Sequence, residues 1–243
     1  MSQFILALAA VLSLSSVSFA GDASTAAQIG FSQDGKFFSY MEYGVADGSG
    51  FPYAMVKFIE LEKNAFASPQ VSVTNEDDQV GGIESLRAVR KKALLEARPS
   101  LAKLQISKAY FGEVLASRKL TDLSAASVSK IKFARFPVIR GLISPTYELN
   151  LVTKPATHSA KCYFNEKAVM LNLTLKNTAT AKSITLQNDS TLPLSRGCVT
   201  GYRIQEVIAQ ENDDRRVVVL LNVLTTGFEG DDSRTMAISG MLP

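Results

Sequence analysis

One stretch near the N-terminus, residues 30–61, constrains the fold of this 243-residue chain more than any other. Two runs rich in apolar and aromatic residues, at 37–43 and 53–61, flank a connection rich in glycine and aspartate. A turn signal, Asp34-Gly35, precedes the first run. Such runs, separated by turn residues, are typical of antiparallel strands, and the first run is partly apolar on both faces. The stretch therefore predicts a β-hairpin with a long connecting loop, whose first strand is central in its sheet.

The composition changes after this hairpin, because good helix formers follow one another over residues 83–97. Their apolar members recur with the period of a helix, and we expect Pro99 to end that helix, with one or two further turns over residues 100–106. We interpret the basic residues along this helix as a solvated surface. The alternative is a surface that binds a membrane or a nucleic acid. The basic residues are Arg87, Arg90, Lys91 and Arg98.

From residue 131 onward the pattern favours strands separated by turn residues, as in an antiparallel sheet or sandwich. The predicted strands are 131–133, 146–152, 168–175, 183–187, 202–210, 216–225 and 235–241. Residues 217–221 are uninterrupted aliphatic, which predicts a strand buried on both faces. The expected fold class is α+β, mainly antiparallel β with one principal helix. We expect a single mature domain over 21–243, with a hairpin unit (21–74), a helical segment (75–128) and a β region (129–243).

The first twenty residues resemble a secretory signal peptide, with an apolar core and small residues before a predicted cleavage between Ala20 and Gly21. No Lys or Arg precedes the apolar core, which departs from the usual pattern. The unbroken apolar run, residues 4–12, is far shorter than the roughly 20 residues that cross a bilayer. A buried N-terminal helix or a membrane anchor is the alternative. No later segment is long enough to span a membrane, so we expect a periplasmic or secreted protein.

The two cysteines, Cys162 and Cys198, are expected to pair in an oxidising compartment. Closing that loop is worth about 4 kcal/mol at most in the chain-entropy model. The alternative is two buried free thiols that pack as small apolar groups. The formal net charge of +3 is too small to indicate a nucleic-acid partner.

Three motifs taken together resemble a known family. They are F-S-Q-D-G-K-F-F-S-Y-M-E-Y-G with D-G-S-G-F-P-Y, then S-R-G-C-V-T-G-Y-R-I, then T-G-F-E-G-D-D-S-R. In that order, behind a signal peptide, they are similar to the predicted secreted bacterial proteins of domain of unknown function 2259. The resemblance covers essentially the whole mature chain. It implies an architecture and a compartment, and it carries no established activity.

The residue inventory excludes several enzyme classes. His158 is the only histidine, so a histidine-rich metal site cannot form, and a Ser-His-Asp triad would have to use it. We read it as an exposed loop residue. Two S-x-x-K matches, at 100–103 and 127–130, lack supporting motifs, and no phosphate-binding loop is present. No catalytic residue is therefore assigned.

Residues able to bind outnumber residues able to catalyse, so we expect a non-enzymatic module that binds an unknown protein or a small ligand at loops 44–53 and 227–234. The binding candidates are Tyr43, Asp47, Phe51, Tyr53, Arg196, Tyr202, Phe228, Glu229, Asp231 and Arg234. A hydrolase that uses the loop carboxylates, or a structural envelope protein without a ligand, is the alternative. No cofactor is expected. Oxygen ligands for calcium could gather if the acidic loops converge, although Asp and Gly usually make turns.

Overall fold

The computed structural model describes residues 21–77, 82–118, 129–135, 146–156, 162, 167–210, 215–227 and 230–243. The first half holds β1 (Thr25–Phe31), β2 (Phe37–Val45), β3 (Pro52–Glu60), β4 (Ala65–Phe66), β5 (Val71–Thr74), α1 (Ile83–Lys103), η1 (Lys108–Tyr110) and β6 (Glu113–Ser117). The second half holds β7 (Lys130–Ala134), β8 (Thr146–Pro155), β9 (Val169–Asn177), β10 (Ser183–Asn188), η3 (Leu194–Arg196), β11 (Val199–Ala209), β12 (Arg216–Thr226) and β13 (Asp231–Met241).

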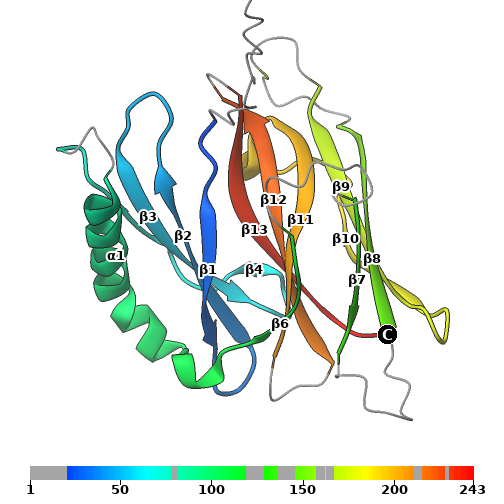
Figure 1. Cartoon of the computed structure of the whole chain (residues 1–243). Coiled ribbons are helices and arrows are strands. Elements are labelled where there is room, and N and C mark those ends of the chain that lie inside the picture. Colours follow the sequence, from blue (N-terminus) through cyan, green and yellow to red (C-terminus); the bar gives the residue numbers. More distant parts are fainter. Residues whose placement is uncertain are drawn as a thin grey trace, which may run out of the picture.

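The strands form three antiparallel sheets, and α1 adds a fourth layer (Figure 1). The first sheet has the order β1-β2-β3-β4, with β5 also paired to β3. The second, central sheet has the order β13-β12-β11-β6, and the third has the order β10-β9-β8-β7. Figure 1 shows the layers in sequence from α1 at the left to β8 and β9 at the right. The prediction of a mainly antiparallel α+β fold with one principal helix is confirmed.

Each gap between layers holds its own hydrophobic core. Val89, Ala93 and Ala97 of α1 pack on one face of the first sheet. The other face of that sheet, with Phe38, packs on Leu220 of the central sheet. A third core lies between the central and third sheets. Because the central sheet is covered on both faces, residues 217–221 are all buried, as their unbroken aliphatic run predicted.

Helix α1 does not end at Pro99, which corrects the sequence prediction. It continues to Lys103, with Pro99 inside it. Leu101 and Leu104 pack against the same core as the earlier turns, and this packing maintains the helix where proline removes a backbone donor. Strand β6, in a stretch that showed no clear pattern in the sequence, pairs with β11 at the edge of the central sheet.

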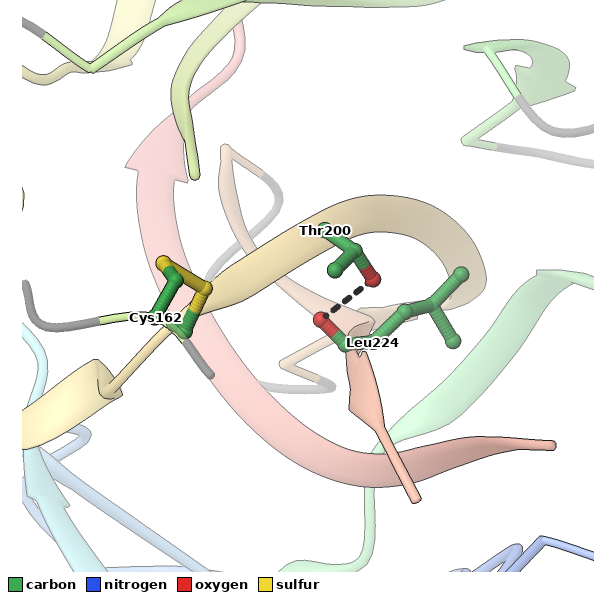
Figure 2. Close-up of a disulfide and its surroundings, with 4 residues drawn as sticks. Cys162, Thr200 and Leu224 are labelled. Carbon is green, nitrogen blue, oxygen red and sulfur yellow. Dashed lines mark hydrogen bonds between the residues drawn. A yellow bond between two sulfur atoms is a disulfide. The ribbon is translucent and has the colours of Figure 1, made fainter. Parts of the chain in front are cut away.

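A disulfide joins Cys162 to Cys198, with their Cα atoms 5.3 Å apart, which confirms the predicted pairing. Cys198 immediately precedes β11 of the central sheet. Figure 2 shows the bridge beside this strand, where the Thr200 hydroxyl donates to the carbonyl oxygen of Leu224 in β12 at 3.3 Å. The bridge therefore fixes the chain at the start of β11.

Candidate functional site

The connection at residues 46–51 lies at the same end of the molecule as the end of β12 and the start of β13 (Figure 1). The start of the described chain is held against β13. The Ser233 N–H donates to the carbonyl oxygen of Asp22 at 2.8 Å, and the Ser24 N–H donates to that of Ser233 at 3.1 Å. A Cβ at Gly21 would lie 2.3 Å from the carbonyl oxygen of Asp231, so the close approach requires glycine. Residues 21–24 are thereby fixed against β13.

The structure places Asp231 and Arg234 in a strand, where the sequence had predicted a loop over residues 227–234. That prediction is wrong for 231–234, because β13 pairs with β12 in an unbroken register that begins at Thr226 and Asp231. Alternation along the strand then decides which way each side chain points. Asp231 is exposed, whereas Arg234 is only partly exposed and turns toward the first sheet.

Asp22 joins two of the predicted binding residues. The Tyr53 hydroxyl donates to Asp22 Oδ1 at 2.9 Å, and the Arg234 guanidinium pairs with Asp22 Oδ2 at 2.6 Å. The same guanidinium lies 5.0 Å from the centre of the Tyr53 ring. Burial raises the pKa of Tyr53 well above its ordinary value, so its hydroxyl stays protonated and remains a donor. Tyr53 and Arg234 therefore meet through a buried carboxylate.

A buried ion pair continues this network between the first and central sheets. Glu42 in β2 has no exposed surface, and Lys57 in β3 donates to its carboxylate. Lys57 also donates to the carbonyl oxygen of Thr235 at 3.1 Å, while the Thr235 N–H donates to Glu42 Oε1 at 3.1 Å. The Tyr40 hydroxyl gives that carbonyl oxygen a second donor at 2.8 Å, and burial raises the pKa of Tyr40. Both backbone groups of Thr235 are thus satisfied by side chains of the first sheet.

Arg196 is also held by a buried carboxylate. Its guanidinium pairs with Asp189 Oδ2 at 2.5 Å and donates to the Tyr202 hydroxyl at 3.2 Å. Asp189 also accepts the backbone N–H of Leu171 at 2.9 Å, which fixes its position. Burial raises the pKa of the Tyr202 hydroxyl. Arg196 and Tyr202, which were both predicted as binding residues, therefore form one hydrogen-bonded unit.

These units border a groove of about 470 Å³ that runs along β13, and we call it the β13 groove. Its floor includes residues 234–238, and its cationic groups are Lys57, Arg196 and Arg234. Much of the remaining lining is apolar and comes from β3, β4, β12, β13 and the residue that precedes η3. These residues include Ile59, Ala65, Phe66, Pro193, Val223 and Met236. The structure thus brings Arg196 and Arg234 to one cavity, together with Lys57.

The other predicted residues lie elsewhere. Tyr43 stacks under Arg90 of α1, whose guanidinium is 4.0 Å from the ring centre. Asp47 lines a separate hollow of about 500 Å³ with Gly21, Asp22 and the rest of the β2–β3 connection. Phe51 is partly buried at the end of that connection. The predicted residues Phe228, Glu229 and Ala20, together with His158, lie outside the described residues.

The described acidic residues do not form a metal centre: in this part of the chain no three His, Cys, Asp or Glu side chains gather in a metal-binding arrangement. Asp22, Glu42 and Asp189 each accept a hydrogen bond from a neighbouring cation, and Glu42 and Asp189 also accept one from a backbone N–H. Their role here is to position those cations. No helix among the described residues is long and apolar enough to cross a membrane.

Sequence reasoning missed Asp22, Glu42 and Lys57. A signal for two of them was present, because Glu42 and Lys57 interrupt otherwise apolar runs in the two strands of the predicted hairpin. Charged residues are rarely fully buried unless they are paired. The register sets Tyr40 opposite Lys57, so Glu42 lies one diagonal step from its partner. Asp22 carried no such signal, because its partners lie 31 and 212 residues away.

Comparison with known proteins gives one match. The family model described as "Predicted secreted protein (DUF2259)" matches residues 39–241, which is most of the chain. This description agrees with the predicted periplasmic or secreted location. No curated protein and no solved structure matches this chain.

Proposed function

Because the chain belongs to the DUF2259 family of predicted secreted proteins, we propose that it is an exported, non-enzymatic module that binds a small, largely apolar ligand in the β13 groove. The observation that supports this proposal is the groove itself. It is a cavity of about 470 Å³ with a mainly apolar lining and a few fixed polar groups. Ligand sites in proteins commonly have this volume and this composition.

The charges around the groove favour a ligand without a strong net charge. Each of its three cations already has a carboxylate partner: Lys57 has Glu42, Arg196 has Asp189, and Arg234 has Asp22. An added anion would compete with these partners. The apolar surface is open at the mouth of the groove, in contrast, because Phe66 is 64% exposed there. Leu194, which lies between the lining residues Pro193 and Ser195, is 89% exposed.

A fluorescent probe can test this proposal. We expect N-phenyl-1-naphthylamine, a neutral apolar dye, to bind at one saturable site with a rise in fluorescence. Ala65 lines the groove, so Ala65→Trp should fill part of it and weaken dye binding at least tenfold. Val152→Trp, at a position 50% exposed in the third sheet, is the matched control and should bind as the parent does. A parent that does not bind the dye, or equal binding by both variants, would contradict the proposal.

A further inference from the structure

The free edge of β13 presents backbone hydrogen-bonding groups at alternate residues. β13 pairs with β12 along one side over its whole length, from Asp231 to Met241, without a register shift. In an antiparallel pair, alternate residues turn their N–H and C=O groups away from the partner strand. The contacts of Ser233, Thr235 and Ser239 show that the odd-numbered residues are the outward ones. Within the stretch from Ser233 to Ser239, the fourth outward residue is Ala237.

The chain covers three of these four positions with its own groups. Ser233 pairs with Asp22 and Ser24 through backbone bonds, and Thr235 pairs with Glu42, Lys57 and Tyr40. At Ser239 the side-chain amide of Asn64 acts like a strand residue. The Ser239 N–H donates to Asn64 Oδ1 at 2.6 Å, and Asn64 Nδ2 donates to the Ser239 carbonyl oxygen at 3.2 Å.

Ala237 is the exception. Among the described residues, no side chain or backbone group bonds to its outward N–H or C=O, although Ala237 is only 7% exposed. It is one of the β13 residues that line the groove. Unpaired backbone groups at a sheet edge are a template for another strand. The groove therefore contains one open donor and acceptor pair with the geometry of a strand position.

We propose that the β13 groove binds a short extended peptide segment with apolar side chains, and that one residue of this peptide pairs with the N–H and C=O of Ala237. This inference rests on the proposed function and names the ligand class. The amide of Asn64 already makes the same pair of bonds two residues further along, so an amide is the chemical complement of this edge. A peptide satisfies both groups at Ala237, whereas a hydrocarbon ligand would leave them unpaired.

The two flanking positions limit the length of the segment. Thr235 and Ser239 are occupied by the chain's own groups, and they lie four residues apart on the strand. At about 3.4 Å per residue, this leaves roughly 14 Å for the ligand. That space holds about three extended residues. The side chains of successive peptide residues alternate between the two sides of the added strand. The apolar lining of the groove lies on these sides.

The test uses blocked tripeptides, N-acetyl-Val-Xaa-Val-amide with Ala, Val, Leu or Phe in the centre. We expect at least one of them to displace the naphthylamine dye and to shift the backbone amide resonance of Ala237 in ¹⁵N-labelled protein. Each peptide nitrogen is also methylated in turn. Methylation at one of these positions should weaken binding at least tenfold. Ala237→Pro removes the edge donor at a position where the ladder with β12 does not use it, and it should lower peptide affinity tenfold while dye binding persists.

The NMR and N-methyl measurements need only the parent protein, so they decide the question even if Ala237→Pro does not fold. Dye binding without displacement by any of the four peptides would overturn the peptide inference and leave the proposed function standing. Displacement without a shift at Ala237, or with no loss on N-methylation, would show that only side chains are bound and would also overturn it. A groove that binds neither dye nor peptide would overturn both proposals.

Discussion

Lys57 shows how much a single buried charge can matter in this protein. Its ammonium group compensates Glu42, which has no exposed surface, and both groups bond to the backbone of Thr235. Removing one member of such a pair leaves an uncompensated buried charge, which typically costs about 3–5 kcal/mol. Breaking the pair should therefore weaken the contact between the first and central sheets.

We expect Lys57→Met to lower the free energy of unfolding by about 3–5 kcal/mol, measured by urea denaturation at pH 7. Adding Glu42→Gln should restore part of the loss, because the amide is neutral and keeps an acceptor for the Thr235 N–H. Lys63→Met is the control, since the Lys63 side chain is 70% exposed and its pair with Glu60 should contribute little to stability. A loss in Lys57→Met no larger than in the control would contradict this account.

Strand β11 carries a residue whose charge should oppose folding. Glu206 lies opposite Ser117 of β6 and Leu220 of β12, and burial raises its pKa above the ordinary value. No hydrogen bond or ion pair engages its carboxylate within the part of the chain that the structure describes. A raised folded-state pKa means that its contribution to stability is fully present below the unfolded pKa. That contribution is lost as the pH rises through the folded pKa.

Glu206→Gln should therefore gain stability relative to the parent as the pH rises from 4 to 7, because the amide carries no charge to be buried. The measurement is urea unfolding of both proteins at several pH values over this range. Parallel stability profiles would show that Glu206 titrates alike in the folded and unfolded states. The expected sign is the opposite of that for a carboxylate stabilised by an ion pair.

At the level of elements, the sequence predicted strands better than it predicted what covers them. The aliphatic run 217–221 predicted burial on both faces, because such a run has no polar face to turn to solvent. The helix end at Pro99 was wrong because the packing of Leu101 and Leu104 outweighs the local preference of proline. The groove was not predictable, since it depends on which sheet edges lie together. Periodicity identifies the buried face of a strand, not its neighbour.

At the level of the whole molecule, the disulfide limits the conformational freedom of the unfolded chain. It closes a separation of 36 residues that includes β9 and β10 of the third sheet and ends at the start of β11. We expect Cys162→Ser with Cys198→Ser to lower the free energy of unfolding by up to about 4 kcal/mol. Thermal and urea unfolding would measure this loss. Reductant should destabilise the parent and leave the variant unchanged, and a response of the variant to reductant would contradict this explanation.

The contacts that join the first residues to the last strand have a consequence for biogenesis. Arg234 and Asp22 are 212 residues apart, and Thr235 and Glu42 are 193 residues apart. Both contacts join the N-terminal part of the chain to β13. Such long separations delay folding, because the loop must close before the contact forms. These contacts cannot form until β13 has left the ribosome. The junction of the N-terminal residues and the first sheet with β13 is therefore completed only after the last strand has been synthesised.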